Sequence, residues 1–397
     1  MSCLPESAMR TLLILCLLLF PLPPVLAAEP RIIQLSGSDG TMLALREDGT
    51  VVGWGTFKDG QLGPNPRQYG TTRWARPTLI PLPARAREIA GGAENGYALT
   101  EDGRVLAWGA GVGLGGGRAL ASSDGAVVQV PLPPVRHLYG RDGTAIALLE
   151  DGSLRAWGRR ENGRIGDGLA NKRWGEASPP ALTPVNVPGA TDITQVAMGF
   201  THTLALRRDG TVLSWGSNRY GQLGRQPVQE PALDLPAAVD SLNGVVAIAA
   251  GAYASMAIRR DGTLLAWGSR GNYMLGDGRQ DDPPERFSAT PLPVPGVHAP
   301  KAVQLSMYNA IALFDDGSAM GWGNTDWGTL GLGQKTGYVP RAKRLTVRDI
   351  ALVFSLHYGT YLVKRDGSTW YAGHGGKDEW QSPVLTQATF VPISLTP

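Results

Sequence analysis

The chain has 397 residues with 53 Gly, 30 Pro and 43% apolar residues, so its Gly and Pro content is high but below that of disordered low-complexity protein. Charged residues make up only 18%, and 37 basic against 34 acidic side chains give a dispersed formal charge of +3. These values exclude a disordered chain, a coiled coil and a polybasic nucleic-acid binder, and they indicate a large, turn-rich globular protein.

The first predicted element is a secretory signal peptide over residues 1–28. Met9-Arg10 precede an apolar run from Leu12 to Phe20, and small residues follow at Ala27-Ala28. A basic start, about ten apolar residues and a small-residue end are typical of such signals. We expect a cut after Ala27 or Ala28; an uncleaved anchor is the alternative. The run is too short to span a bilayer, so we expect no stable membrane insertion.

Both cysteines, Cys3 and Cys16, lie inside this leader. The mature chain, residues 29–397, is therefore predicted to contain neither a disulfide nor a cysteine-based metal site. We expect it to be exported to the periplasm or the extracellular space, most consistent with a bacterial protein.

A repeated motif dominates the rest of the chain. An Asp-Gly pair is followed, after four residues, by Trp-Gly. The six pairs begin at Asp48, Asp102, Asp151, Asp209, Asp261 and Asp316, and a degraded seventh copy starts at Asp366 with Ala372-Gly373 in place of Trp-Gly. Six matches at one offset establish an internal repeat of about 50 residues.

Each repeat reads as three or four short strands. An apolar run such as Thr203–Leu206 enters the Asp-Gly pair, which we expect to form a two-residue hairpin turn with positive φ at both positions. A second strand ends at Trp-Gly, and a Gly-rich turn such as Gly221–Gly224 leads to a last strand. Trp suits the gap between sheets, and the following Gly lets a neighbouring backbone approach.

Seven such units predict an all-β fold, a seven-bladed β-propeller, because radial repetition limits exposed sheet edges. Each unit either forms one blade or the ring closes by borrowing a strand from Ile32–Leu35 or from Val391–Leu395.

The repeats resemble a known family. Gly199-Phe200-Thr201-His202-Thr203-Leu204-Ala205-Leu206 and the following Asp209–Gly216 and Ser217–Gly224 look like the regulator of chromosome condensation (RCC1-like) repeat over most of the mature chain. The resemblance implies a propeller that binds proteins. The founding member is a nuclear guanine-nucleotide exchange factor, and an exchange-factor-like regulator is the alternative if the chain is not exported. Among secreted relatives, the chain also looks like beta-lactamase inhibitor protein II, which caps an enzyme with one propeller face.

The sequence does not indicate an enzyme. No two of the five histidines have a ligand-like spacing, and we expect His202 to be a hydrogen-bonded structural residue. We therefore predict no catalysis, no cofactor and no metal. A propeller glycoside hydrolase that uses axial carboxylates such as Asp39 and Asp142 is an alternative.

The candidate partner-binding residues precede each Asp-Gly glycine by nine or ten positions, in the turn before the apolar strand. They are acidic in repeats one to three and aromatic in the others: Asp39, Glu94, Asp142, Phe200, Tyr253, Tyr308 and Tyr358. These turns should ring one mouth of the channel, where aromatic residues anchor protein partners. The alternative is that the aromatic residues only plug the channel or pack on the next blade. His357, beside Tyr358, is added as a protonation-sensitive contact.

Two loops form a second candidate surface. Trp74, next to Arg73, and Trp174, next to Arg173, follow the Gly-rich turns, and Trp327 also departs from the repeat. Such tips suit a protein partner or, as an alternative, a glycan or cell-wall polymer. The sequence as a whole predicts a monomeric, non-catalytic module that binds another envelope or secreted protein and no nucleic acid.

Overall fold

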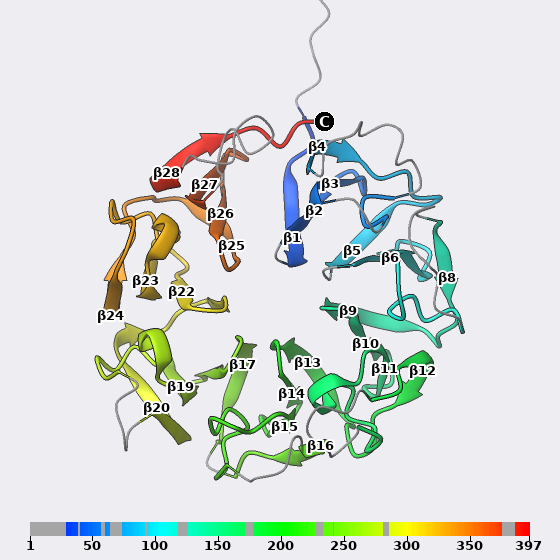
Figure 1. The fold of residues 1–397 in the computed structure, drawn as a ribbon, viewed down its shortest axis with the longest axis horizontal. Helices are drawn as coiled ribbons and strands as arrows, with labels where there is room; N and C mark the ends of the chain where they lie inside the picture. The colour runs from blue at the N-terminus through cyan, green and yellow to red at the C-terminus, as the bar shows by residue number, and fades with distance from the viewer. Residues whose placement is uncertain are drawn as a thin grey trace, which may run out of the picture.

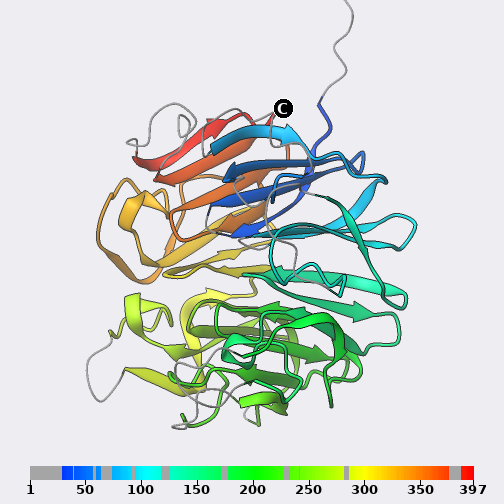
Figure 2. The same ribbon diagram turned by 45° about the vertical axis from the view of Figure 1, so that its right-hand side comes forward.

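The computed structural model describes residues 29–38, 40–56, 60–63, 74–91, 94–117, 126–170, 178–227, 233–240, 242–280, 286–374 and 386–397. Over these residues the chain forms seven antiparallel sheets of four strands each, arranged around a central axis (Figures 1 and 2). The predicted seven-bladed β-propeller is confirmed.

The strands follow one another in chain order, four to a blade. Blades 1 to 3 contain β1 (Ile32–Ser38), β2 (Thr41–Arg46), β3 (Val51–Thr56) and β4 (Trp74–Leu79), then β5 (Ala86–Gly91), β6 (Asn95–Thr100), β7 (Val105–Gly109) and β8 (Val128–Val130), then β9 (Val135–Arg141), β10 (Thr144–Leu149), β11 (Leu154–Gly158) and β12 (Ala181–Asn186). Blades 4 and 5 contain β13 (Ile193–Met198), β14 (His202–Arg207), β15 (Val212–Gly216) and β16 (Leu233–Ala238), then β17 (Val245–Ala250), β18 (Ala254–Arg259), β19 (Thr263–Ser269) and β20 (Phe287–His298). Blades 6 and 7 contain β21 (Ala302–Leu305), β22 (Asn309–Leu313), β23 (Ala319–Asn324) and β24 (Tyr338–Arg344), then β25 (Ile350–Ser355), β26 (Gly359–Lys364), β27 (Thr369–His374) and β28 (Thr386–Ile393).

The ring closes through side chains. Each repeat supplies its own four strands, so the borrowed-strand alternative is wrong. At the seam between blades 1 and 7, the ring centres of Trp54 and Tyr361 are 5.7 Å apart. The Trp54 indole N–H donates to the Tyr361 hydroxyl at 3.3 Å. The hydrophobic cluster at this seam contains Leu35 from blade 1 and Val363 from blade 7. Apolar packing therefore holds the two chain ends together.

The Asp-Gly pairs adopt a different turn from the one predicted. Gly49 has φ 80°, but none of the seven aspartates has positive φ. In the first repeat the Gly49 N–H donates to the Arg46 carbonyl, and the Arg46 N–H donates to the Thr50 carbonyl, each at 3.0 Å. This is a three-residue loop with glycine in the left-handed position. The Asp48 carboxylate accepts the Thr50 N–H at 2.9 Å, which stabilises the loop from the side chain.

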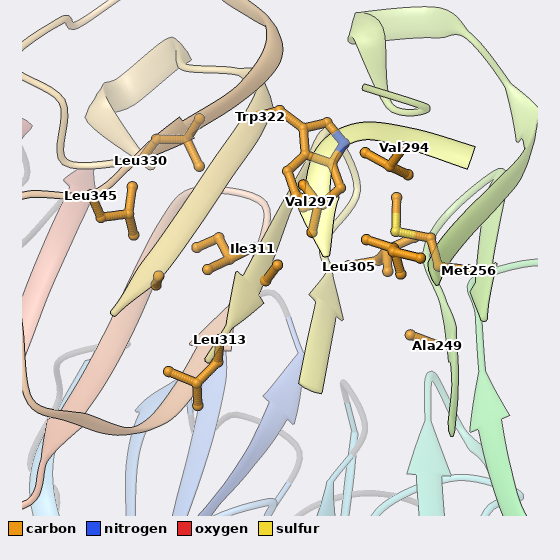
Figure 3. Close-up of a cluster of buried hydrophobic side chains, with 14 of the residues drawn as sticks. Ala249, Met256, Val294, Val297, Leu305, Ile311, Leu313, Trp322, Leu330 and Leu345 are labelled. Atoms are coloured by element: carbon orange, nitrogen blue, oxygen red, sulfur yellow. The ribbon is translucent and has the colours of Figure 1, made fainter. Parts of the chain in front are cut away.

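The repeated tryptophans join each blade to the one before it, as their position predicted. Trp322 is fully buried, and its indole N–H donates to the Met274 carbonyl of blade 5 at 3.0 Å. Figure 3 shows Trp322 packed beside Val294 and Val297 in this core. Equivalent bonds to the preceding blade are made by Trp108, Trp157, Trp215 and Trp267.

The glycine after each tryptophan is required by a close backbone approach. A Cβ on Gly158 would lie 2.0 Å from the Gly143 carbonyl oxygen, and Gly158 also has φ 97°. Blade 7 has Ala372 where the tryptophan would stand. In this blade, Phe390 of the last strand packs against the Gly-rich turn of blade 6 instead. The contact is close: a Cβ added to Gly331 would lie 2.3 Å from the Phe390 ring.

Polar side chains on the inner strands also link neighbouring blades. The Gln34 amide donates to the Ile89 carbonyl and accepts the Ile89 N–H, both at 2.8 Å. Gln195 makes the same pair of bonds with Ile248, at 3.3 and 3.1 Å. These amides satisfy inner-strand backbone groups that face the axial channel, which has a volume of about 330 Å³.

Strand directions define two faces of the ring. In each antiparallel sheet the first and third strands run in the same direction. The first turn and the last loop of every blade therefore lie at one end, which we call the turn-loop face. The Asp-Gly turns lie at the opposite end, the Asp-Gly face. The described mouth turns and the start of β4 at Trp74 thus belong to the same face.

Candidate protein-binding face

Most of the predicted residues lie where the sequence placed them, in the first turns of the blades. Asp39 and Trp174 lie outside the described residues. Trp74 begins β4 at the turn-loop face, but its side chain is likewise outside the description. The first turns contain Glu94, Asp142, Phe200, Tyr253, Tyr308, His357 and Tyr358.

The described acidic candidates, Glu94 and Asp142, are paired with arginines of blade 3. Both Glu94 carboxylate oxygens accept hydrogen bonds from the Arg159 guanidinium, at 2.6 and 2.8 Å. The Asp142 carboxylate lies 3.7 Å from the Arg141 guanidinium and 3.8 Å from that of Arg164. Arg164 is buried, and this burial lowers the pKa of its guanidinium. Glu94 and Asp142 are therefore both parts of ion pairs.

Phe200 and Arg141 connect this charged sector to the aromatic one. The Arg141 guanidinium carbon lies 4.3 Å from the centre of the Phe200 ring, within the range of cation–π attraction. Phe200 is half-buried, so its ring packs against the Arg141 guanidinium and also forms part of the exposed face.

The aromatic residues of blades 5 to 7 are more exposed. Tyr253 is 42% exposed and packs edge-on against Tyr220, with ring centres 5.3 Å apart. Tyr358 is 45% exposed and stacks on His357 at 4.0 Å, and His357 in turn contacts Tyr308 at 4.7 Å. None of these four first-turn residues lines the axial cavity. The contacts of Tyr253 with Tyr220 and of Tyr308 with His357 join neighbouring blades, so these rings do pack between blades, as the second part of the alternative holds.

Further aromatic residues on the same face come from the last loops and the strand ends beside them, and they were not predicted from the sequence as a set. Trp327 is 43% exposed and packs on His374, and Tyr338 is 46% exposed and packs on Tyr273. Their sequence signal is position: Tyr220 and Trp327 each immediately precede the first glycine of a Gly-rich turn. Blades 4 to 7 thus present an aromatic arc. Its members are Tyr220, Tyr253, Tyr273, Tyr308, Trp327, Tyr338 and Tyr358.

His202 is structural, as predicted. It is fully buried, and its Nε2 lies 2.8 Å from the Ser255 hydroxyl of the next blade. Burial lowers the pKa of His202 to about 3, so the ring stays neutral at ordinary pH. In the described part of the chain, no group of three or more His, Cys, Asp or Glu side chains is arranged to hold a metal ion. No helix among the described residues is long and apolar enough to cross a membrane.

The chain is similar to several proteins of known type. It is 29% identical over 325 residues to the human E3 ubiquitin-protein ligase HERC2, covering 77% of this chain and 6% of HERC2. It is 28% identical to protein pim1 of Schizosaccharomyces pombe, covering 64% of this chain and 49% of pim1. It is 27% identical to the mouse regulator of chromosome condensation, covering 66% of this chain and 65% of that protein. The chain therefore spans less than two thirds of each of these relatives.

Solved structures agree on the fold. The crystal structure of Prp20p from Saccharomyces cerevisiae superposes with a TM-score of 0.74 at 23% identity, covering 92% of this chain and 87% of that one. Human WBSCR16 superposes with a TM-score of 0.69 at 20% identity, covering 82% and 84%. The RCC1-like domain family matches residues 20–288. The chain therefore belongs to the RCC1-like domain family, whose propellers are mostly non-catalytic modules for protein interaction.

Proposed function

We propose that this propeller is exported and that it binds another envelope or secreted protein, as a monomer and without catalysis, through its turn-loop face. The partner is held by the aromatic arc of blades 4 to 7, and the ion-paired sector of blades 2 and 3 borders it.

The observation that carries the proposal is the exposure of large aromatic side chains on one face. Tyr253, Trp327, Tyr338 and Tyr358 are each more than 40% exposed, although burial of such rings is favourable. Tyr and Trp are enriched among the residues that dominate binding energy at protein interfaces. They stand on first turns, a last loop and a strand end that the blades hold in place, so binding orders few groups.

Export is supported by the composition of residues 1–28, which lie outside the described residues. The proposed mode resembles that of beta-lactamase inhibitor protein II, which caps its target with one propeller face. The printed title of the Prp20p structure names binding to Gsp1p and histones, so a propeller of this fold serves protein partners in that case.

The test compares two double variants in capture of proteins from the native envelope. Tyr253→Ala with Tyr358→Ala removes two exposed rings from the turn-loop face. Ile33→Ala with Val246→Ala removes side chains of similar exposure, 50% and 47%, from strand ends at the Asp-Gly face. We expect the first pair to abolish specific capture and the second to preserve it. Equal capture by both pairs would refute the proposal.

A second candidate is a regulator of a small GTPase. It is favoured by the similarity to the yeast guanine nucleotide exchange factor SRM1, 26% identical over 66% of this chain and 58% of SRM1. It requires that the chain remain in the cell. Acceleration of nucleotide release from a GTPase of the host would favour it. Binding to purified cell-wall polymer that is lost on Trp74→Ala and Trp174→Ala would instead favour the glycan alternative.

A further inference from the structure

We propose that Asp326, Trp327 and Tyr358 form a subsite, here the 6/7 subsite, that binds one cationic side chain, Arg or Lys, of the protein partner. The inference deepens the proposed function and rests on it, because the subsite lies within the turn-loop face.

The two rings of the subsite come from neighbouring blades. Trp327 lies in the loop between β23 and β24 of blade 6, and Tyr358 lies in the first turn of blade 7. Their ring centres are 6.3 Å apart with planes at 71°, and the two residues are 43% and 45% exposed. His374 packs against Trp327 at 4.7 Å and supports it from the blade. Exposed Trp and Tyr faces carry negative potential and attract cations within about 6 Å.

A carboxylate without a cation, that of Asp326, directly precedes Trp327 in the same turn. One Asp326 oxygen accepts the Gly337 N–H at 3.1 Å, and the other accepts the Asn324 side-chain amide at 3.0 Å. Both donors are neutral, and no Lys, Arg or His of the described chain forms a salt bridge with Asp326. Glu94, on the same face, is paired with Arg159. The half-buried Asp326 charge thus complements a positive group supplied from outside.

The backbone at Trp327 is held in a conformation that a tryptophan rarely adopts. Its φ is 66°, in the left-handed region, and the matching residues in blades 3 and 5 are Asn162 and Asn272. Asparagine tolerates this region, whereas a bulky residue there is strained. The loop is fixed by the Trp327 N–H bond to the Lys335 carbonyl at 2.9 Å. Asparagine would satisfy the turn, so the strained tryptophan at this position is assigned to ligand contact.

The experiment uses N-acetyl-arginine amide as probe and N-acetyl-citrulline amide as its neutral analogue of nearly equal shape. Indole N–H resonances of the full propeller are followed by NMR, and that of Trp327 is assigned by its loss in Trp327→Asn. We expect the arginine probe to shift the Trp327 resonance and to bind roughly tenfold more tightly than the citrulline probe. Asp326→Asn should weaken arginine binding about threefold and leave citrulline binding unchanged.

Val246→Ala, which removes a 47% exposed side chain from the Asp-Gly face, is the control and should leave both titrations unchanged. Equal binding of the two probes, or an unchanged Trp327 resonance at saturating probe, would overturn the cation subsite. Because this titration needs no partner protein, its failure is distinguishable from failure of the capture experiment. If the arginine probe binds but the capture experiment retains no protein, only the proposed function is contradicted.

Discussion

Replacing Trp322 with Phe tests the hydrogen bonds that join one blade to the next. Among the described residues, the Trp322 indole is the only donor to the buried Met274 carbonyl. Phe removes part of a packed ring, at a cost of about 1–2 kcal/mol. It also leaves that carbonyl unpaired, at a cost of about 1–3 kcal/mol. We expect the free energy of unfolding to fall by roughly 2–5 kcal/mol.

Trp267→Phe provides a matched comparison in the preceding blade. Trp267 is equally buried, but the Gln222 carbonyl that accepts its indole N–H also accepts the Ser255 hydroxyl at 2.8 Å. This carbonyl stays paired in the variant, so we expect a loss smaller by about 1–2 kcal/mol. Urea denaturation followed by circular dichroism measures both midpoints. If Trp267→Phe destabilised the protein as much as Trp322→Phe, the assigned role of the carbonyl would be wrong.

Further predictions address backbone strain, pH, the loop of blade 6 and export. Gly158→Ala, whose Cβ would lie 2.0 Å from a turn carbonyl, should cost about 2–4 kcal/mol of unfolding free energy, whereas Gly103→Ala, with φ 84° and nothing within 4 Å, should cost only about 1 kcal/mol. The folded-state pKa of His202, about 3, lies below its ordinary 6.5, so between these values only the unfolded chain takes up the proton. The urea midpoint should therefore fall as pH drops from 6.5 towards 3, and His202→Gln should reduce the pH dependence of the midpoint above pH 5. Trp327→Asn should change the melting temperature little, since relief of strain offsets lost ring contacts; a fall of more than about 5 °C would argue against the strain. N-terminal sequencing of the exported protein should start at Ala28 or the residue after it, and an intact Met1 would contradict cleavage.

The repeat made the fold predictable. Six Asp-Gly and Trp-Gly pairs at one offset indicate a strand, a turn and a second strand in each unit. The buried Trp215 lies between sheets, and Gly158 lies at a close backbone approach, as predicted. These features depend on residues close together in the sequence, where periodicity and turn chemistry are informative.

Features that depend on the relation between repeats were not predictable in the same way. Asp-Gly is compatible with a two-residue or a three-residue hairpin, and only the hydrogen bonds at Arg46 show the longer one. The use of Phe390 in place of the missing seventh tryptophan depends on packing between blades 6 and 7. Nothing in the spacing of the motifs contains that information.

The candidate face was predictable in its position but not in its contacts. The offset from Asp-Gly placed Tyr253 and Tyr358 in the first turns, where the structure has them. The pairing of Glu94 with Arg159 joins residues 65 positions apart, and the contact of Tyr358 with Trp327 joins two blades. Such contacts arise only when the ring brings separate repeats together.

Site-specific photo-crosslinking in the native host tests the binding face most directly. A photoreactive phenylalanine is placed at Tyr253 or Tyr358 on the turn-loop face, and at the exposed Arg208 or Arg365 on the Asp-Gly face. We predict that the first two positions capture one and the same protein outside the cytoplasm and that the other two capture none. Capture from Arg208 and Arg365, with none from the tyrosine positions, would contradict the assignment of the binding face.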